Sequence, residues 1–387
     1  MKMKFFILLS LVIFLIGCST NNEITNKTYD VDININNISE AFIPASEKAI
    51  QSSIGVSAYV KSGIFASWEL GSIGSGVVYY GQAYLNDGTV IDDITKTKDR
   101  NDVKYYVYRA ITNHHVVYVS AREVQTKVYL SKIDSLVDAK ILGSNPYEDL
   151  AVVEFSTSIY IPLITIADST DISTGEIVLA VGNPEGYKYF DSVTLGIISN
   201  PNRYVDVKRD TNNDGRNDWE GSCEYLQHDA AINSGNSGGA LVNIKGELIG
   251  INVMKLVDSN ATIEGMGFAI PSNVIKIYLN DMENGKVIKI KEINGNIFNV
   301  NQIINKDLFK DVPDVKIPTN FLYEYGVYIY NTNDYGLNNG DIVIQLNDYN
   351  IYNVAVLNET LRNDCTNELR WKVFRNGNIV EVIYNIK

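Results

Sequence analysis

Between residues 54 and 268, hydrophobic positions come in short runs that are separated by Gly, Asn and Asp. The runs are rich in β-branched and aromatic residues, and they lack the repeat of three to four residues that an amphipathic helix shows. Many short strands with turn residues between them predict an all-β barrel or sandwich. Two polar, charged stretches interrupt this rhythm, residues 81–104 and 201–222, and we expect both to be surface loops.

Residues 271–283 follow a helical pattern instead. They start with Ser-Asn after a proline, and their apolar positions are spaced as on one face of a short helix, at Val274, Ile275, Tyr278 and Leu279. A distinct block follows, which mixes strands with one expected helix around residues 354–362. The patterns predict a mostly β protein that ends in a small α+β block.

The N-terminus has the pattern of a secretion signal. Two lysines precede an apolar run over residues 5–16, which is shorter than the about 20 residues needed to span a bilayer. The run ends in Leu-Ile-Gly-Cys, which resembles a bacterial lipobox and implies lipidation of Cys18 after removal of residues 1–17. Residues 18–45 are rich in Asn, Thr and Glu and are expected to form a flexible tether. We therefore expect an extracytoplasmic, lipid-anchored body; a plain signal peptide with an incidental cysteine is the alternative.

Composition limits the partners. The chain has 387 residues, of which 45% are hydrophobic and 20% charged, with room for two or more domains. The net charge of -13 argues against a nucleic-acid partner. The remaining cysteines, Cys223 and Cys365, lie in different expected domains; two separate buried thiols are favoured, and a disulfide stays open.

Candidate chemistry lies in the segment INSGNSGGAL, residues 232–241, where glycine and asparagine surround Ser237. The segment matches G-x-S-x-G, the nucleophile elbow of α/β-hydrolases, but that fold needs a helix after the serine and a later histidine. Here a strand pattern follows, and all three histidines precede Ser237. The elbow interpretation is excluded.

The order His, Asp, Ser fits a different arrangement. His115 ends one apparent strand, Asp149 heads another, and Ser237 follows. A serine hydroxyl needs a base to take its proton, and a carboxylate must hold that imidazole in the right tautomer. The glycines allow the N–H groups of Gly235 and Ser237 to point into one small cavity as an oxyanion hole.

Several segments resemble the HtrA (Deg-type) serine proteases: AITNHHVV, EDLAVVEF and DAAINSGNSGGALVN, with GSGVV, LAVGNPEG, SVTLGIIS and GMGFAIPSN in family order. The likeness covers residues 49–277. It implies a chymotrypsin-like double β-barrel over residues 46–280, with the site between the barrels and the triad on His115, Asp149 and Ser237. It also implies a PDZ-like domain over residues 284–387, and family members commonly form homotrimers.

Rival residues are assigned other roles. His114 is expected to pack or to lie at the surface, turned away from Ser237 by strand alternation. His228 is expected to be structural or exposed. Glu148 and Asp138 are rival carboxylates, but only Asp149 begins the D-L-A-V strand.

The residue six positions before Ser237 indicates which side chain the enzyme prefers at the cleavage site. Trypsin-like enzymes that cleave after Lys or Arg carry an acidic residue six positions before the nucleophile, which here is Ala231. We expect cleavage after small apolar side chains, and hence unfolded or damaged proteins as substrates. Asn236 stands where trypsin-like zymogens need an Asp, so activation by propeptide cleavage is not expected.

The stretch DTNNDGRND, residues 210–218, has the oxygen-rich spacing of a calcium loop. Its candidate ligands are Asp210, Asn212, Asp214 and Asp218. The twelfth position is Gly221, where an EF-hand has a bidentate Glu, so a solvated acidic loop is the alternative. The resemblance places this loop in the regulatory region of the family.

The sequence thus predicts an extracytoplasmic serine endopeptidase for protein quality control that needs no cofactor, with structural or regulatory calcium as an option. A chaperone-like holdase or scaffold is the alternative. An esterase or acyltransferase is disfavoured by the residue order.

Overall fold

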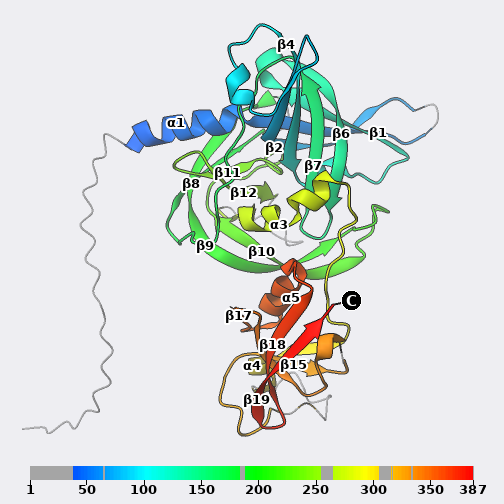
Figure 1. The fold of residues 1–387 in the computed structure, drawn as a ribbon, viewed down its shortest axis with the longest axis vertical. Coiled ribbons are helices and arrows are strands. Elements are labelled where there is room, and N and C mark those ends of the chain that lie inside the picture. The colour runs from blue at the N-terminus through cyan, green and yellow to red at the C-terminus, as the bar shows by residue number, and fades with distance from the viewer. Residues whose placement is uncertain are drawn as a thin grey trace, which may run out of the picture. The chain divides into compact units, whose positions relative to one another are not determined.

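The computed structural model describes residues 38–63, 66–183, 188–253, 265–304, 315, 317–332 and 334–386 (Figure 1). Residues Ser39–Lys387 form one compact unit, which contains both the expected protease region and the C-terminal block. The expected signal peptide, the lipidation site Cys18 and most of the expected tether lie outside the described residues. None of the helices in these ranges is long and apolar enough to cross a membrane.

The first barrel closes because β1 pairs with both β5 and β2. Its strand order is β1-β5-β6-β7-β4-β2, and the short β3 (Val90–Ile91) extends the sheet beside β2. Side chains at alternate positions of β4 turn inward, with Tyr106, Tyr108 and Ala110 buried, as expected of a strand with one face in the core. The strands are β1 (Ser53–Lys61), β2 (Glu69–Leu85), β4 (Val103–Thr112), β5 (Glu123–Leu130), β6 (Ser135–Asn145) and β7 (Leu150–Thr157).

The second barrel is also closed, in the order β10-β13-β12-β11-β8-β9. Leu226, Leu241 and Ile198 are among its fully buried residues. Two closed barrels confirm the chymotrypsin-like fold expected from the resemblance. The strands are β8 (Ile177–Gly182), β9 (Ser192–Arg209), β10 (Trp219–His228), β11 (Ala240–Asn243), β12 (Leu248–Val253) and β13 (Gly267–Pro271).

The expected loop over residues 201–222 is largely strand, whereas the one over residues 81–104 is strand only in part. Residues 201–209 belong to β9 and residues 219–222 to β10, and the two strands stay paired out to Arg209 and Trp219. Only residues 210–218 connect them. Much of this hairpin is exposed or half-buried, so its sequence lacks the buried apolar run by which a strand is recognised. In residues 81–104, β2 continues to Leu85, and β3 and a short 3₁₀ helix (Ile94–Thr97) follow.

Three helices flank the barrels. α1 (Ile38–Gln51) overlaps the expected flexible tether, so this expectation was wrong for residues 38–45. Ala45 and Ala49 of α1 pack in a buried cluster to which both barrels contribute. α2 (His114–Val117) is a single turn where a strand end was expected. α3 (Ser272–Glu283) confirms the helix predicted from its apolar spacing.

The C-terminal block is a sheet in the order β14-β15-β16-β18-β19, with β17 beside β16. Helix α5 confirms the predicted helix, and its Leu357 and Leu361 pack with Trp371 in a fully buried core. The elements are β14 (Asn296–Asn299), α4 (Val300–Ile304), β15 (Val327–Tyr330), β16 (Ile342–Leu346), β17 (Tyr349–Asn350), α5 (Val354–Asn363), β18 (Glu368–Arg375) and β19 (Asn378–Asn385).

Candidate active site

His115 and Asp149 are in direct contact. The Nδ1 atom of His115 lies 2.8 Å from Asp149 Oδ2, and the His115 backbone N–H donates to Asp149 Oδ1 at 3.0 Å. The main-chain oxygen of Asp149 accepts two more bonds, from the Asn113 side-chain amide and from the His114 N–H. Asp149 therefore holds both the ring of His115 and the turn that carries it.

Asp149 adopts a left-handed backbone conformation, with φ at 58°, directly before β7 begins. Aspartate is one of the few residues other than glycine that tolerate this conformation. It lets the main-chain oxygen and the carboxylate of one residue both face the turn at residues 113–115. The sequence pattern placed Asp149 at the head of a strand, and this backbone geometry is what makes that position useful.

The charges of the pair depend on each other. Burial raises the pKa of Asp149, but the neighbouring His115 and Arg209 lower it more strongly, so the carboxylate stays ionised. Burial lowers the pKa of His115, but the charge and the hydrogen bond of Asp149 outweigh it and hold that pKa above its ordinary value; Arg209 opposes this rise. His115 is 41% exposed, whereas Asp149 is 2% exposed, so the ring has one fixed edge and one accessible edge.

The loop that carries Ser237 is held in place by hydrogen bonds that its carbonyl oxygens accept. The Asn236 N–H donates to the Asn233 oxygen, which closes a turn with Gly235 at φ 98°, a conformation that favours glycine. Ser75 donates from its hydroxyl to the Gly235 oxygen at 2.7 Å and from its N–H to the Ser237 oxygen at 2.8 Å. Ser75 thus holds the loop from the first barrel.

This arrangement leaves two amides free. Within the described ranges, the N–H groups of Gly235 and Ser237 donate to no other group. They are the two donors that the sequence assigned to an oxyanion hole. Backbone amides already held in place cost little reorganisation when negative charge develops nearby.

The serine loop packs on the segment that carries His115. At Gly238, with φ at 83°, a Cβ atom would lie 2.2 Å from the Ser75 oxygen and 2.4 Å from Thr112 Oγ1, so only glycine fits. Ser237 is 3% exposed. Among the described residues, the Ser237 hydroxyl forms no hydrogen bond with His115. The structure therefore joins His115 to Asp149 directly and brings the Ser237 loop against the same segment.

The rival histidines have other partners. His114 is buried on the α2 turn rather than on a strand; its Nε2 lies 3.0 Å from Asn213 Oδ1, and its ring stacks on Tyr118. This is a packing role, as expected. His228 is fully buried in β10, and burial lowers its pKa to about 4, so it is neutral near pH 7.

The rival carboxylates are engaged elsewhere. Glu148 is 2% exposed and accepts from Arg362 Nε at 2.6 Å. Asp138 is exposed on β6 and pairs with Lys127. Both carboxylates are therefore bonded to side chains other than His115.

The expected calcium loop is built from turns. Asp210 accepts the N–H groups of Asp214 and Gly215, and Asn212 Oδ1 also accepts from Asp214 N–H. Asp218 accepts from the N–H and hydroxyl of Thr211. Within the described ranges, the carboxylates of this loop do not gather as a set of three ligand atoms within 4.8 Å. Calcium binding stays a prediction.

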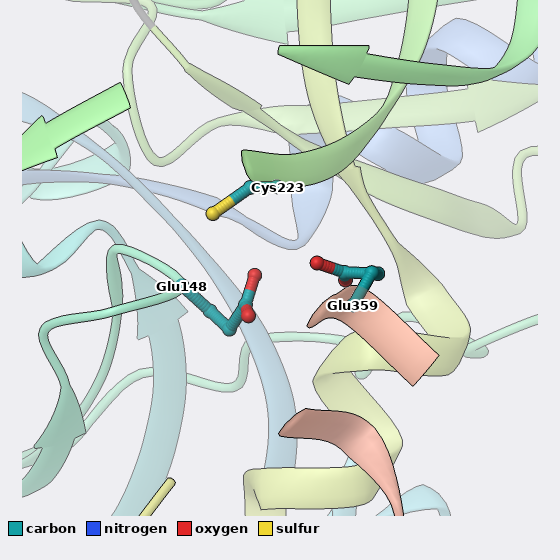
Figure 2. Close-up of side chains that lie close together, drawn as sticks. All are labelled: Glu148, Cys223 and Glu359. Atoms are coloured by element: carbon teal, nitrogen blue, oxygen red, sulfur yellow. The ribbon is translucent and has the colours of Figure 1, made fainter. Parts of the chain in front are cut away.

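Another set of potential ligands does gather, where α5 meets β10. Glu148, Cys223 and Glu359 bring their ligand atoms within 4.8 Å of one another, all buried (Figure 2). The guanidinium of Arg362 bonds to both carboxylates and lies 3.7 Å from the Cys223 sulfur, so this side chain supplies the positive charge of the cluster.

Neither cysteine is paired. Cys223 and Cys365 are both free, which agrees with the favoured expectation of separate thiols. Cys365 is exposed rather than buried, so the expected burial was wrong for this residue.

Sequence reasoning missed two residues at this site. Ser75 could have been noticed as the small polar residue of the quoted GSGVV segment, between two glycines. Arg209, whose Nη1 lies 3.6 Å from Asp149 Oδ2, gave no local signal because it reaches Asp149 through the pairing of β9 with β10.

Parts of the chain are similar in sequence to known serine proteases. Residues 88–251 match the family described as trypsin-like peptidase domain. The chain is 42% identical over 180 residues to the serine protease Do-like HtrB of Bacillus subtilis (strain 168), which covers 46% of this chain and 36% of that protein. It is 29% identical over 341 residues to the serine protease Do-like HtrA of Lactococcus lactis subsp. cremoris (strain MG1363), with 86% of this chain and 78% of that protein covered.

A solved structure shares the fold. The HtrA-type protease AlgW with a decapeptide superposes with a TM-score of 0.58 at 22% identity, and it covers 89% of this chain and 97% of that chain. Residues 88–251 therefore match a trypsin-like peptidase domain, and the whole chain shares the fold of an HtrA-type protease. The relatives that the chain resembles in sequence are serine proteases of the HtrA type. The chain spans only about a third of the length of the Bacillus relative.

Proposed function

We propose that this protein hydrolyses peptide bonds of unfolded proteins through a Ser-His-Asp mechanism. Ser237 is the nucleophile, His115 the general base and Asp149 the residue that orients the imidazole. The observation that carries the proposal is the hydrogen bond of Asp149 to His115 Nδ1, which fixes the tautomer that leaves Nε2 to accept a proton.

The steps follow from these groups. His115 Nε2 takes the hydroxyl proton as Ser237 Oγ bonds to the carbonyl carbon, and the two free amides of Gly235 and Ser237 stabilise the oxyanion. The C–N bond then breaks, and the imidazolium gives its proton to the leaving amine. Water attacks the acyl-enzyme in the same way and releases the carboxylic acid, which restores Ser237.

Substrate choice follows from the surroundings of Ser237. Ala231 replaces the acidic residue that would favour Lys or Arg, so the proposed cleavage follows small apolar side chains. Such side chains are buried in folded proteins. Unfolded chains expose them, which supports a role in quality control.

The proposal also covers where the protein lies in the cell and how it assembles. The apolar N-terminal run and Cys18 support an extracytoplasmic protein held to the membrane by lipid. The sheet and helix of residues 284–387 support a PDZ-like module. A homotrimer is the expected assembly because family members commonly form one.

Digestion of unfolded casein tests the activity. We expect the wild type to cleave casein and to react with a fluorophosphonate probe, and Ser237→Ala to lose at least about 10⁴-fold in kcat while still binding casein. Ser156→Ala is the matched control, because Ser156 is exposed on β7, and it should retain full activity.

Two outcomes contradict the proposal. If Ser237→Ala digests casein at the wild-type rate, Ser237 is not the nucleophile. If the wild type does not cleave casein but prevents its aggregation, the chain is a holdase instead.

A further inference from the structure

A second charged side chain reaches Asp149. Arg209 is the last residue of β9, and its Nη1 lies 3.6 Å from Asp149 Oδ2, the same oxygen that contacts the His115 ring. The Arg209 side chain is 19% exposed and that of Asp149 2%. A charge pair this well covered is screened by solvent far less than a surface pair.

The hairpin holds Arg209 in this position. The Arg209 main chain is paired with Trp219 of β10, and its oxygen accepts the Asp218 N–H at 3.0 Å. Its Nη2 donates to the Tyr225 hydroxyl at 2.7 Å, and the Tyr225 ring is buried against Phe268. One nitrogen is thus anchored in the second barrel while the other faces Asp149, a residue of the first barrel.

We propose that Arg209 is a positioning residue for the reaction, whose guanidinium fixes the carboxylate that orients His115. This inference rests on the proposed function of His115 as the base. Asp149 Oδ2 then contacts both the imidazole and the guanidinium, so the carboxylate keeps its orientation through the proton cycle.

The charge of Arg209 also affects the base. Arg209 lowers the pKa of both His115 and Asp149, so it keeps His115 neutral down to a lower pH than Asp149 alone would allow. Other ionisable groups surround the pair. They are His114 on the α2 turn, Glu148 before β7, and Cys223 and Tyr225 on β10.

None of these groups replaces Arg209. His114 is kept neutral because burial lowers its pKa. Burial raises the pKa values of Cys223 and Tyr225, so both stay uncharged. Glu148 is paired with Arg362. Arg209 is therefore the cation that acts on this carboxylate among the residues that the structure describes.

The test is the pH dependence of fluorophosphonate labelling of Ser237, which follows the neutral fraction of the base. In Arg209→Gln we expect the acid-side midpoint to rise by about 0.5–1 pH unit, because the opposing positive charge is gone. Arg209→Lys keeps the charge and should stay near the wild-type midpoint. Arg203→Gln is the matched control, since Arg203 lies on the same strand but bonds to Gln227, and it should not move the midpoint.

A purely structural role would lower the labelled fraction without moving the midpoint, and that result would overturn the inference. An equal shift in Arg209→Lys and Arg209→Gln would also overturn it, because charge would then not be the cause. If Arg209→Gln does not fold, Arg209→Met replaces the charge by an apolar side chain of similar length and gives the same comparison. Absence of labelling in the wild type would instead refute the proposed function, so the two failures are distinguishable.

Discussion

Asp149 holds residues 113–115 through both its main-chain oxygen and its carboxylate, so a single residue links the local turn to the chemistry of the ring. The order of His115, Asp149 and Ser237 in the sequence singled out these three residues, and in the structure His115 and Asp149 are in contact. The contacts that Ser75 and Arg209 make could not be predicted from the sequence, because they depend on segments that are distant in the chain. Residue types identify the chemistry of a site, whereas the groups that support it come from tertiary pairing.

His228 gives a prediction for stability at this scale. Its pKa is lowered by burial to about 4, so below its ordinary value of 6.5 the unfolded chain binds a proton that the folded chain refuses. Stability is therefore fully present above pH 6.5 and falls as the pH drops toward 4. Between pH 7.5 and pH 5 the loss from this residue amounts to about 2 kcal/mol.

Urea unfolding of wild type and His228→Gln at the two pH values measures this loss. The variant should lose less stability on acidification than the wild type, by about 2 kcal/mol. His114→Gln is a comparison with smaller expected effect, because the lowering of the pKa of His114 is less pronounced. Identical acid sensitivity of wild type and His228→Gln would show that His228 does not titrate in this range.

At the scale of elements, the sequence predicted helices and strands whose apolar residues recur at a regular spacing, and it missed elements that lack such a spacing. The helices at α3 and α5 follow from their spacing. Residues 201–222 of the β9–β10 hairpin were expected to be a loop because they are polar and charged. The first residues of α1, up to Ala45, were expected to belong to a flexible tether because that stretch is rich in Asn, Thr and Glu. Both elements are defined by what they pack against rather than by their own pattern.

The tip of this hairpin gives a calcium prediction. Residues 210–218 carry the oxygen-rich spacing of a calcium loop, and their carboxylates must turn from backbone N–H groups toward an ion for it to bind. If they do, millimolar calcium should raise the melting temperature of the wild type by about 1–3 °C relative to EGTA. Asp214→Ala should abolish the rise, and Asp87→Ala, in an exposed turn of the first barrel, should retain it. Equal melting temperatures with calcium and EGTA would leave the solvated-loop alternative.

At the scale of the whole molecule, the barrels and the C-terminal block belong to one compact unit, and a buried ion cluster joins them. Arg362 of α5 is 2% exposed, bonds to Glu148 beside the catalytic candidate Asp149, and also bonds to Glu359. Its guanidinium covers the ring of Trp219 at 5.2 Å. From α3, the Tyr278 hydroxyl donates to the Asn363 side chain at 2.8 Å. A sequence pattern predicts each domain separately, whereas this contact needs both to be folded.

Removal of Arg362 should loosen this contact. Burial raises the pKa of Glu359, the charge of Glu148 raises it further, and Arg362 opposes both. Without Arg362, the carboxylates can stay buried only by taking up protons. A carboxyl group whose pKa is raised on folding loses stability as the pH rises, so Arg362→Met should be most destabilised at high pH, by about 3–5 kcal/mol at pH 8.

Scanning calorimetry at pH 5.5 and pH 8 tests this expectation. Arg362→Met should melt earlier than the wild type at pH 8 and with a smaller difference at pH 5.5. The triple variant Glu148→Gln, Glu359→Gln, Arg362→Met should recover part of the loss because no unpaired charge remains. Arg370→Met is the matched control, since Arg370 is exposed on β18 and pairs with Glu368. If Arg362→Met and Arg370→Met melt alike at both pH values, the cluster does not hold the C-terminal block against the barrels.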